Sequence, residues 1–384
     1  MSRHQTNAIQ GAVEDWIASL DAPDAQDAQS WREALLKSAP KRFTIYEPLA
    51  LLPAGSFTAE PWVSEIGRRD ADTQAALWSL MLKQLSKKAK STLTNLAVNE
   101  GIPLHSEAGK TGNIRRSPSG LRMLFGDFGP AQTDAEAPLE DDFARALWVS
   151  TKQNGILQTW APRWTMFSRG NVKEKARLLA FPSAREESMA GSVWAIDLYA
   201  GIGYFVFCYA SLGMRVLCWE INPWSVEGLR RGARANRWTV KVVQGHDLAL
   251  PLSQALAGGE QIVVFLEGNE EAPRRIKEAQ ALGLVENVEH VNCGFLPSSA
   301  PSWKPALAMT CLSPEGWLHL HENVGVNDID ARRGTIQRLV EDWSASEGRC
   351  RSPTVAHVEQ VKTFAPGVWH CVFDVRITGR PSGA

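Results

Sequence analysis

Beyond residue 190, short apolar runs alternate with stretches in which apolar residues recur at helical spacing. Short runs rich in Val, Ile and aromatic residues are typical of buried strands, and strands that alternate with helices are typical of a parallel βαβ array. The predicted strands cover 193–199, 215–221, 239–244, 261–267, 288–296 and 316–324, and a closing pair covers 354–364 and 368–377. Because only APG joins the closing pair, we expect those two strands to be antiparallel. The pattern predicts a doubly wound, mostly parallel α/β sheet.

The first 120 residues follow a different pattern. In the segments 13–20 and 73–98, apolar residues recur every three or four positions, which indicates amphipathic helices. The segment 142–153 shows the same spacing, whereas 101–122 is rich in Gly, Ser, Lys and Arg and is typical of an exposed loop. We therefore expect a mostly helical N-terminal domain over 1–120, a linking region over 121–185 and the α/β domain over 186–384.

The composition narrows the class of protein. Lys and Arg number 41 against 42 Asp and Glu, so the net charge gives no global sign of a polyanionic partner, although a local basic patch would suffice for nucleic acid. The six cysteines lie far apart, without metal-type spacing, which favours buried, reduced thiols. No run of about 18 apolar residues occurs. We expect a cytoplasmic protein without membrane contact or bound metal, and the sequence does not indicate its oligomeric state.

The first predicted strand leads into two glycines, in the stretch WAIDLYAGIGYF at 194–205. In a doubly wound sheet, ligands bind outside the carboxyl ends of the strands, where the first loop must let a ligand approach the backbone. Gly201 and Gly203 permit this approach, because a Cβ at either position would intrude or forbid the turn. A dinucleotide fingerprint would place a third glycine where Val206 stands, and no GxxxxGK[ST] stretch occurs. The loop therefore lacks the cradle for NAD, FAD or a nucleoside triphosphate.

A carboxylate ends each of the first two predicted strands. Glu220 lies where a carboxylate can accept hydrogen bonds from both hydroxyls of a ribose. With Asp197 ahead of the glycines and Glu220 behind them, a nucleoside without phosphates fits best, and S-adenosylmethionine is the common one. The alternative is a tight strand–helix turn followed by a solvated glutamate.

Several stretches resemble a known family. DLYAGIGYF at 197–205 and CWEINPWSVEGLRRGARAN at 218–236 resemble the class I methyltransferase-like domain of two kinds of tRNA enzyme that act at position 37, next to the anticodon. One kind is the guanine-N1 methyltransferases, and the other is the tRNA wybutosine-synthesizing protein 2 family of aminocarboxypropyltransferases. The resemblance to the wybutosine family covers roughly residues 121–378 and includes GDFGP at 126–130 and WLHLHENV at 317–324. It implies a seven-stranded sheet, to which the periodicity of the first 120 residues adds a smaller, largely helical N-terminal domain.

One position distinguishes these two relatives. The guanine methyltransferases carry an Asn-Leu-Pro-type stretch where this chain has GFLPSS, and Gly294 cannot supply an amide to a guanine edge. The resemblance therefore implies transfer of the 3-amino-3-carboxypropyl group of S-adenosylmethionine to C7 of 4-demethylwyosine in tRNA-Phe, with release of 5′-methylthioadenosine. Two alternatives stay open, namely a tRNA guanine-N1 methyltransferase acting at position 37 and a non-catalytic tRNA-binding scaffold.

The resemblance also implies roles for individual cofactor-binding residues. The polar turn 167–171 should cover the cofactor, with Lys175 pairing with the methionine carboxylate as a point charge. At 267–271, EGNEE stands where relatives meet the adenine, and Asn269 is the better candidate to read its amine, the alternative being a helix N-cap. The expected cofactor-binding residues are Ser168, Lys175, Asp197, Tyr199, Ala200, Gly201, Gly203, Glu220, Asn222, Gly268 and Asn269.

The substrate side is less well marked. Glu322 ends a predicted strand near the expected substrate and is the candidate acceptor for the proton that C7 loses, with a structural hydrogen-bonding role as the alternative. His319 and His321 project to one face of that strand, but no third ligand has the spacing that a metal requires. Basic clusters are usually solvated surface. The expected contacts to substrate or tRNA are Arg163, Arg169, Asn171, Pro297, Arg115 and Arg116.

Overall fold

The structure, a computed structural model, describes residues 7–20, 28–100, 120–131, 137–181, 193–346 and 351–379. The chain divides into two compact units. The first contains Met1–Thr151 and Trp160–Met166, and the second contains Lys152–Thr159 and Phe167–Ala384. The predicted linking region 121–185 therefore contributes residues to both units.

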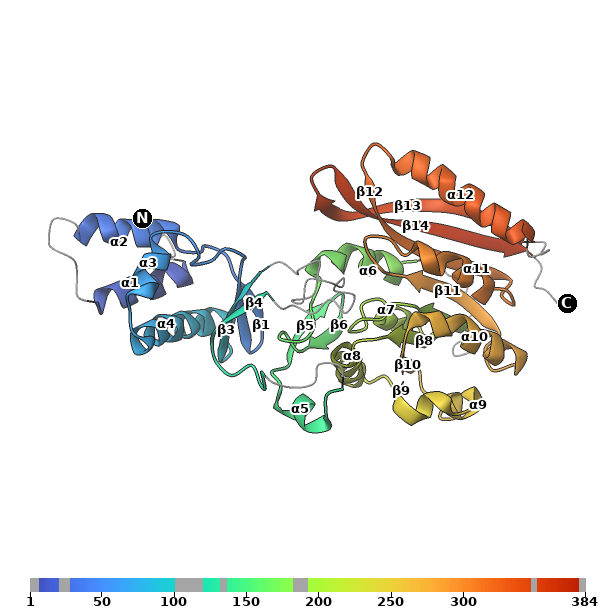
Figure 1. Ribbon diagram of the computed structural model, residues 1–384, viewed down its shortest axis with the longest axis horizontal. Helices are drawn as coiled ribbons and strands as arrows, with labels where there is room; N and C mark the ends of the chain where they lie inside the picture. Colours follow the sequence, from blue (N-terminus) through green and yellow to red (C-terminus); the bar gives the residue numbers. More distant parts are fainter. Residues whose placement is uncertain are drawn as a thin grey trace. The chain divides into compact units, whose positions relative to one another are not determined.

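The N-terminal unit packs helices against a small sheet (Figure 1). The helices of this core are α1 (Ala8–Ala18), α2 (Ala28–Ser38), α3 (Trp62–Gly67) and α4 (Ala71–Ala89), and α5 (Glu140–Arg145) belongs to the unit but lies outside the core. The strands are β1 (Thr44–Tyr46), β2 (Leu49–Leu52), β3 (Asn95–Asn99) and β4 (Leu121–Phe125). They pair in the order β1-β2-β3-β4, with β2 and β3 parallel. The hydrophobic pattern predicts the helices but not this sheet, because its strands are only three to five residues long.

Helix α4 is shorter than predicted. It begins after Asp70, whose side chain accepts a hydrogen bond from the backbone nitrogen of Thr73 (2.7 Å). It ends at Ala89, because Lys90 adopts a left-handed conformation that terminates the helix. The helix predicted over 73–98 is therefore wrong in its last part, where the buried residues of β3 pair with β2 and β4.

A hairpin replaces a second predicted helix. Strands β5 (Val149–Gln153) and β6 (Ile156–Trp160) form a two-stranded sheet. Between them, Asn154 and Gly155 have φ angles of 50° and 82°, as in the two-residue turns whose twist matches that of paired strands. The helix predicted over 142–153 is wrong beyond Arg145, where α5 ends.

The second unit is built on an eight-stranded sheet, which agrees with the eight strands that the hydrophobic pattern predicts and exceeds by one the seven that the resemblance implies. The strand order is β13-β14-β12-β11-β7-β8-β10-β9, and β9, at the predicted strand 239–244, pairs with β10 at the edge of the sheet. The six neighbouring strands β12, β11, β7, β8, β10 and β9 are parallel to one another. Strand β14 is antiparallel to both β12 and β13. The strands are β7 (Val193–Asp197), β8 (Arg215–Glu220), β9 (Val240–Val243), β10 (Ile262–Leu266), β11 (Asn287–Cys293), β12 (Glu315–Gly325), β13 (Arg351–Ala365) and β14 (Val368–Gly379).

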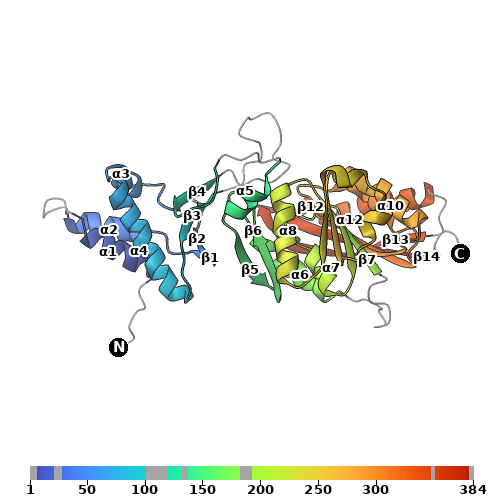
Figure 2. The same ribbon diagram turned by 90° about the horizontal axis from the view of Figure 1, so that it is seen from below.

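Helices cover both faces of this sheet, as the alternating pattern predicts (Figure 2). One face carries α6, α7 and α8, and the other carries α9 to α12. The helices are α6 (Val172–Leu179), α7 (Val206–Ser211), α8 (Pro223–Ala235), α9 (Leu252–Leu256), α10 (Ala272–Ala281), α11 (Trp303–Met309) and α12 (Ile329–Ser346). Strand β7 is buried along its whole length, as expected for a central strand of a parallel sheet. No helix in the described ranges is long and apolar enough to cross a membrane.

Candidate functional site

The carboxyl ends of β7 and β8 place Asp197 and Glu220 at the same edge of the sheet. Asp197 is fully buried, and its Oδ1 accepts hydrogen bonds from Tyr199 N and from Asn292 Nδ2, both at 3.1 Å. Burial raises the pKa of the Asp197 carboxyl to about 7, and the hydrogen bonds offset this only in part. Oδ2 is buried without a partner in the described part of the chain. Such an oxygen is suited to accept a hydrogen bond from a bound ligand.

The glycine loop is joined to Glu220. Gly201 N donates to Glu220 Oε2 at 2.8 Å, and Oε1 accepts from the backbone nitrogens of Ile221 and Asn222 at 2.9 and 2.8 Å. Because Oε1 already accepts two hydrogen bonds, a ribose hydroxyl would be met at Oε2. The φ angles of Gly201 and Gly203 are 55° and 90°, so both positions need glycine for the backbone itself.

The structure revises the reason for Gly203. A Cβ there would lie 2.6 Å from Phe207 Cζ, so it would strike the protein's own ring in addition to straining the turn. At Gly201 a Cβ would lie 2.9 Å from Tyr204 Cδ2. The loop is therefore shaped by the aromatic rings packed beneath it as well as by the space that a ligand needs.

The expected adenine contacts lie close together. The Tyr199 ring stacks on Phe295 with centroids 5.2 Å apart. Burial raises the pKa of the Tyr199 hydroxyl, and hydrogen bonds with Ser302 and Asn269 partly offset this rise. Gly268 precedes the short 3₁₀ helix η4 (Asn269–Glu271) and is its N-cap position, so the alternative role of Asn269 as an N-cap is not what the structure shows.

Three neighbouring residues have structural contacts. Asn222 caps α8, where its Oδ1 accepts from Trp224 N at 3.0 Å. Ala200 is buried, and its N donates to the Trp219 carbonyl at 2.9 Å. Glu267 accepts two hydrogen bonds from the buried Arg275, at 2.5 and 2.8 Å. Glu267 thus forms an internal ion pair.

Lys175 is a buried cation close to the glycine loop. It lies on α6 and is only 3% exposed. Its Nζ donates to Gln153 Oε1 at 3.0 Å and to Gln158 Oε1, and Gln158 Nε2 donates to the Gly203 carbonyl at 3.4 Å. Lys175 forms no ion pair within the described residues, and burial lowers its pKa to about 8. A chain of hydrogen bonds therefore runs from this cation to the glycine loop.

The turn before α6 holds a residue that sequence reasoning missed. Ser168 N donates to the Tyr204 hydroxyl at 3.1 Å. Lys362, on β13, donates from Nζ to Ser168 Oγ at 2.8 Å and to Asn171 Oδ1 at 3.2 Å. Arg169 opens the short 3₁₀ helix η1 (Arg169–Asn171). A lysine within a strand pattern carries no local signal, so only the fold could bring Lys362 to this turn.

Glu322 has the contacts of a structural residue. Arg332 binds its two oxygens at 2.6 and 2.9 Å, and Ser298 Oγ donates to Oε1 at 2.8 Å. Because Arg332 and Ser298 already occupy both carboxylate oxygens, these contacts favour the structural alternative. The Pro297 carbonyl accepts from Asn323 N at 2.8 Å, which joins the GFLPSS stretch to the same strand.

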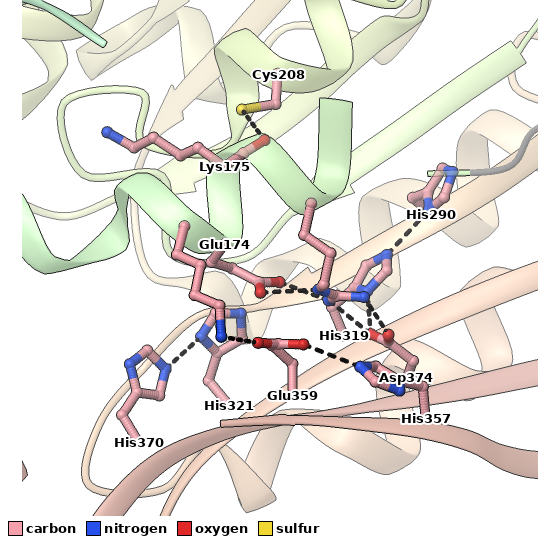
Figure 3. Close-up of polar contacts among 12 residues, drawn as sticks. Glu174, Lys175, Cys208, His290, His319, His321, His357, Glu359, His370 and Asp374 are labelled. Atoms are coloured by element: carbon pink, nitrogen blue, oxygen red, sulfur yellow. Dashed lines mark hydrogen bonds and ion pairs between the residues drawn. The ribbon is translucent and has the colours of Figure 1, made fainter. Parts of the chain in front are cut away.

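The strand histidines belong to a buried polar network (Figure 3). His319 Nδ1 lies 2.7 Å from Asp374 Oδ1, and His319 Nε2 lies 3.0 Å from His290 Nδ1. Arg177, on α6, binds both Asp374 and Glu174. His321 Nδ1 lies 2.9 Å from a further buried histidine, at position 370. No group of three or more potential ligand side chains in the described ranges is arranged to hold a metal ion.

The residues expected to contact tRNA are only partly described. Arg163 Nη2 lies 3.2 Å from Met123 Sδ, and its Nε is buried without a hydrogen-bond partner in the described ranges. Arg115 and Arg116 lie outside the described residues.

The strand order, the Asp197 and Glu220 positions and the glycine loop together define a class I methyltransferase-like domain. The solved structures agree with this fold. The crystal structure of Pyrococcus horikoshii TYW2 in complex with MeSAdo superimposes with a TM-score of 0.57 at 16% identity, over 96% of this chain and 99% of that one. The structure of Trm5b from Pyrococcus abyssi gives 0.54 at 14% identity, over 99% and 82%.

Sequence comparison identifies the family. tRNA wybutosine-synthesizing protein 2 of Schizosaccharomyces pombe is 39% identical over 338 residues, which cover 88% of this chain and 72% of that protein. The Saccharomyces cerevisiae protein of the same name is 32% identical over 410 residues, covering 98% and 81%. The chain matches no family model. On these relatives, the chain belongs to the tRNA wybutosine-synthesizing protein 2 family.

Proposed function

We propose that this protein transfers the 3-amino-3-carboxypropyl group of S-adenosylmethionine to C7 of 4-demethylwyosine at position 37 of tRNA-Phe. The observation that carries the proposal is the pair of charges on either side of the glycine loop. Glu220 binds Gly201 N, and Lys175 reaches Gly203 through Gln158. A nucleoside that carries a charged amino-acid arm matches this arrangement, and membership of the wybutosine family supports the reaction.

The residues present fit S-adenosylmethionine. Glu220 would accept from the ribose hydroxyls, and Tyr199 and Asn269 would lie against the adenine. The unpartnered Oδ2 of Asp197 would accept one further donor. Lys175 would meet the carboxylate of the arm. Gly201, Gly203 and Gly268 supply backbone, and Ser168 closes the turn above Tyr204.

The bound sulfonium supplies the electrophilic carbon, so the chain needs little covalent chemistry of its own. Its residues must orient the arm and the acceptor base, because alignment of the reacting atoms contributes most to such a transfer. As C7 bonds to the γ-carbon of the arm, the carbon–sulfur bond breaks, 5′-methylthioadenosine leaves and C7 loses its proton. The paired Glu322 remains a prediction as the acceptor of that proton.

Gly294 supports this reaction over N1-methylation of guanine. A Cβ at this position would lie 2.9 Å from Nδ2 of Asn292, whose amide binds Asp197. A larger residue would therefore need the Asn292–Asp197 contact to shift. Without a side chain, position 294 also offers no amide to a guanine edge.

The partner and the compartment belong to the same proposal. The relatives' names contain tRNA, and we propose tRNA-Phe as the substrate, with Arg163, Arg169, Asn171 and Pro297 near it. We also propose a cytoplasmic enzyme that needs no metal. The five described cysteines are all free, as expected in a reducing compartment.

The by-product tests the function directly. Purified protein is incubated with S-adenosylmethionine and tRNA-Phe from a strain that cannot complete wybutosine. Release of 5′-methylthioadenosine is expected. S-adenosylhomocysteine would instead identify a methyltransferase, and the absence of any by-product, with tRNA still bound, would identify a non-catalytic scaffold.

A further inference from the structure

Lys362 is partly buried beneath the turn that precedes α6. Its ammonium donates to two neutral oxygens, Ser168 Oγ and Asn171 Oδ1, and forms no ion pair within the described residues. Burial lowers the pKa of Lys362. The lysine is also held closely, because a Cβ on Gly170 would collide with Lys362 Cδ. The glycine of the turn thus makes room for this side chain.

Lys362 and Lys175 are linked through Tyr204, whose hydroxyl accepts from Ser168 N and whose ring centroid lies 5.1 Å from Lys175 Nζ. Burial lowers the pKa of Lys175 to about 8, and the positive charge of Lys362 acts in the same direction. Two poorly solvated cations on either side of the same turn are costly unless an anion binds there. Within the described part of the chain, both ammonium groups donate to amide and hydroxyl oxygens, which carry no net charge.

The nearby carboxylates are already engaged. Glu359, on the same strand as Lys362, pairs with Lys173 at 2.8 Å. Asp374, on the neighbouring strand, pairs with Arg177 at 2.5 Å. His370, opposite Lys362 in the register, has its pKa lowered to about 4 by burial and by Lys362, so it is neutral near pH 7 and supplies no negative charge. An anion that neutralises the two lysines would therefore have to come from outside the described chain.

We infer that Lys362 and Lys175, with Ser168 and Asn171, form the subsite for the α-carboxylate of the aminocarboxypropyl arm. This inference rests on the proposed function. Fixing the carboxylate at the far end of the arm restricts how the arm folds, and therefore which carbon on sulfur faces the acceptor. Lys362 is thus a specificity-determining residue for aminocarboxypropyl against methyl transfer. A tRNA phosphate is the other source of an anion, but the turn and Gly170 confine the lysine.

Binding of three nucleosides to the full chain, measured by titration calorimetry, tests this subsite. S-adenosylmethionine and S-adenosylhomocysteine carry the carboxylate, whereas 5′-methylthioadenosine lacks it. Lys362→Met should weaken binding of the first two by about 10- to 100-fold, the range for one lost charged hydrogen bond, and leave 5′-methylthioadenosine within about twofold. Lys362→Arg should restore part of the affinity.

Lys173→Met is the matched control. Lys173 also joins α6 to β13, through its ion pair with Glu359, but its side chain is 67% exposed. Its loss should therefore change none of the three affinities. With tRNA-Phe present, Lys362→Met should also raise the proportion of S-adenosylhomocysteine among the by-products. If Lys362→Met does not fold, Lys362→Gln keeps a donor to Ser168 without the charge and takes its place.

Other outcomes overturn the inference. Equal weakening of all three nucleosides would make Lys362 a structural support of the turn. Unchanged nucleoside binding with a weaker, less salt-dependent tRNA complex would assign Lys362 to a phosphate. A wild-type protein that binds none of the nucleosides would instead refute the proposed function, so the two failures are distinguishable.

Discussion

Helix α6 carries one set of charges with partners of opposite sign, Glu174 and Arg177, and one charge without such a partner in the described residues, Lys175 (Figure 3). Glu174 and Arg177 are compensated: Arg177 binds Glu174 at 2.6 and 2.9 Å and Asp374 at 2.5 and 3.1 Å. Lys175, the residue after Glu174, has only neutral partners and points away from this network in Figure 3. A compensated charge holds the helix on the sheet, whereas an uncompensated one marks where a ligand must supply the opposite charge.

The ion pair between Arg177 and Asp374 holds α6, and with it Lys175, in position. Burial alone would raise the pKa of Asp374, but the hydrogen bond with His319 and the charge of Arg177 outweigh it and hold that pKa below its usual range. Arg177 thereby ties α6 to β14. Lys175 lies on the same helix, so its approach to the glycine loop depends on this ion pair two residues away.

Arg177→Met should produce the largest effect. It leaves Glu174 and Asp374 buried without their cation, and breaking a buried pair in this way costs about 3–5 kcal/mol. The free energy of unfolding, measured in urea, should fall by this amount. Arg274→Met is the control, because Arg274 is 59% exposed and its pair with Glu271 should contribute less than about 1 kcal/mol. Equal, small losses of unfolding free energy in both variants would show that the Arg177 ion pairs contribute no more than an exposed pair does.

Glu220→Ala should have the next largest effect, on binding. Loss of a charged acceptor weakens a complex by about 1.5–3 kcal/mol. Because Glu220 is expected to hold the ribose, S-adenosylmethionine and 5′-methylthioadenosine should lose affinity equally. Lys362→Met, by contrast, should spare 5′-methylthioadenosine. Unchanged affinity of Glu220→Ala in calorimetry would remove Glu220 from the site, and urea unfolding would show whether loss of the Gly201 contact disturbs the fold.

The same contrast explains what could be predicted from the sequence. The local pattern predicts the positions of four residues within 24 consecutive positions, namely Asp197, Gly201, Gly203 and Glu220. It can do so because strands and tight turns have recognisable patterns in short segments. Lys362 contacts Ser168 across 194 positions, so no local pattern links them. The sequence did not predict the ion pair between Glu322 and Arg332, because Arg332 reaches Glu322 only through the packing of α12 against β12.

The N-terminal unit shows the same limit. Its long helix was predicted from 3.6-residue periodicity, but the end of α4 depends on the backbone of Lys90, a residue with no terminating side chain. The short strands β1 to β4 become stable only by pairing with each other, which periodicity does not report. Local pattern thus predicted the large sheet and the positions of Asp197, the glycine loop and Glu220 in it, and tertiary pairing determined the rest.

A third experiment uses pH to examine Lys175. Its folded pKa, about 8, lies below the usual 10.5 of a lysine, so the free protein loses this charge as the pH rises through about 8. Affinity for S-adenosylmethionine relative to 5′-methylthioadenosine should fall over the same range, by at most about 1.4 kcal/mol per pH unit. For stability the sign is opposite: the unfolded chain binds more protons between pH 8 and 10.5, so the unliganded protein gains stability there.

Lys175→Arg is the control for this measurement, because a guanidinium keeps its charge throughout the range. The groups that face Lys175 are Gln153, Gln158, Cys208, Lys362 and the rings of Phe167 and Tyr204. The amino group of S-adenosylmethionine titrates in both proteins, so only the difference between the two pH profiles reports Lys175. Identical profiles would show that its charge does not take part in binding.

The smallest effect should come from extending the contrast to two arginines of the N-terminal unit. Arg145 is 58% exposed and pairs with Asp141 at 2.8 Å and Asp142 at 3.2 Å. Arg163 contacts only the weak acceptor Met123 Sδ through Nη2, and it forms no ion pair in the described ranges. If an uncompensated charge marks a ligand here as well, Arg163 should meet one tRNA phosphate.

Arg163→Ala should then lower the slope of log K against log salt by about 0.7 for a single-stranded contact or about 0.9 for a duplex, whereas Arg145→Ala should leave it unchanged. The measurement is tRNA-Phe binding at several salt concentrations for the wild type and both variants. Because one phosphate contact is screened at physiological salt, the change in affinity itself should be severalfold at most. Affinity for S-adenosylmethionine should stay constant, since neither arginine belongs to the expected cofactor site. Parallel lines for all three proteins would restrict the rule to the buried lysines of the second unit, where a small carboxylate and not an RNA phosphate is the missing charge.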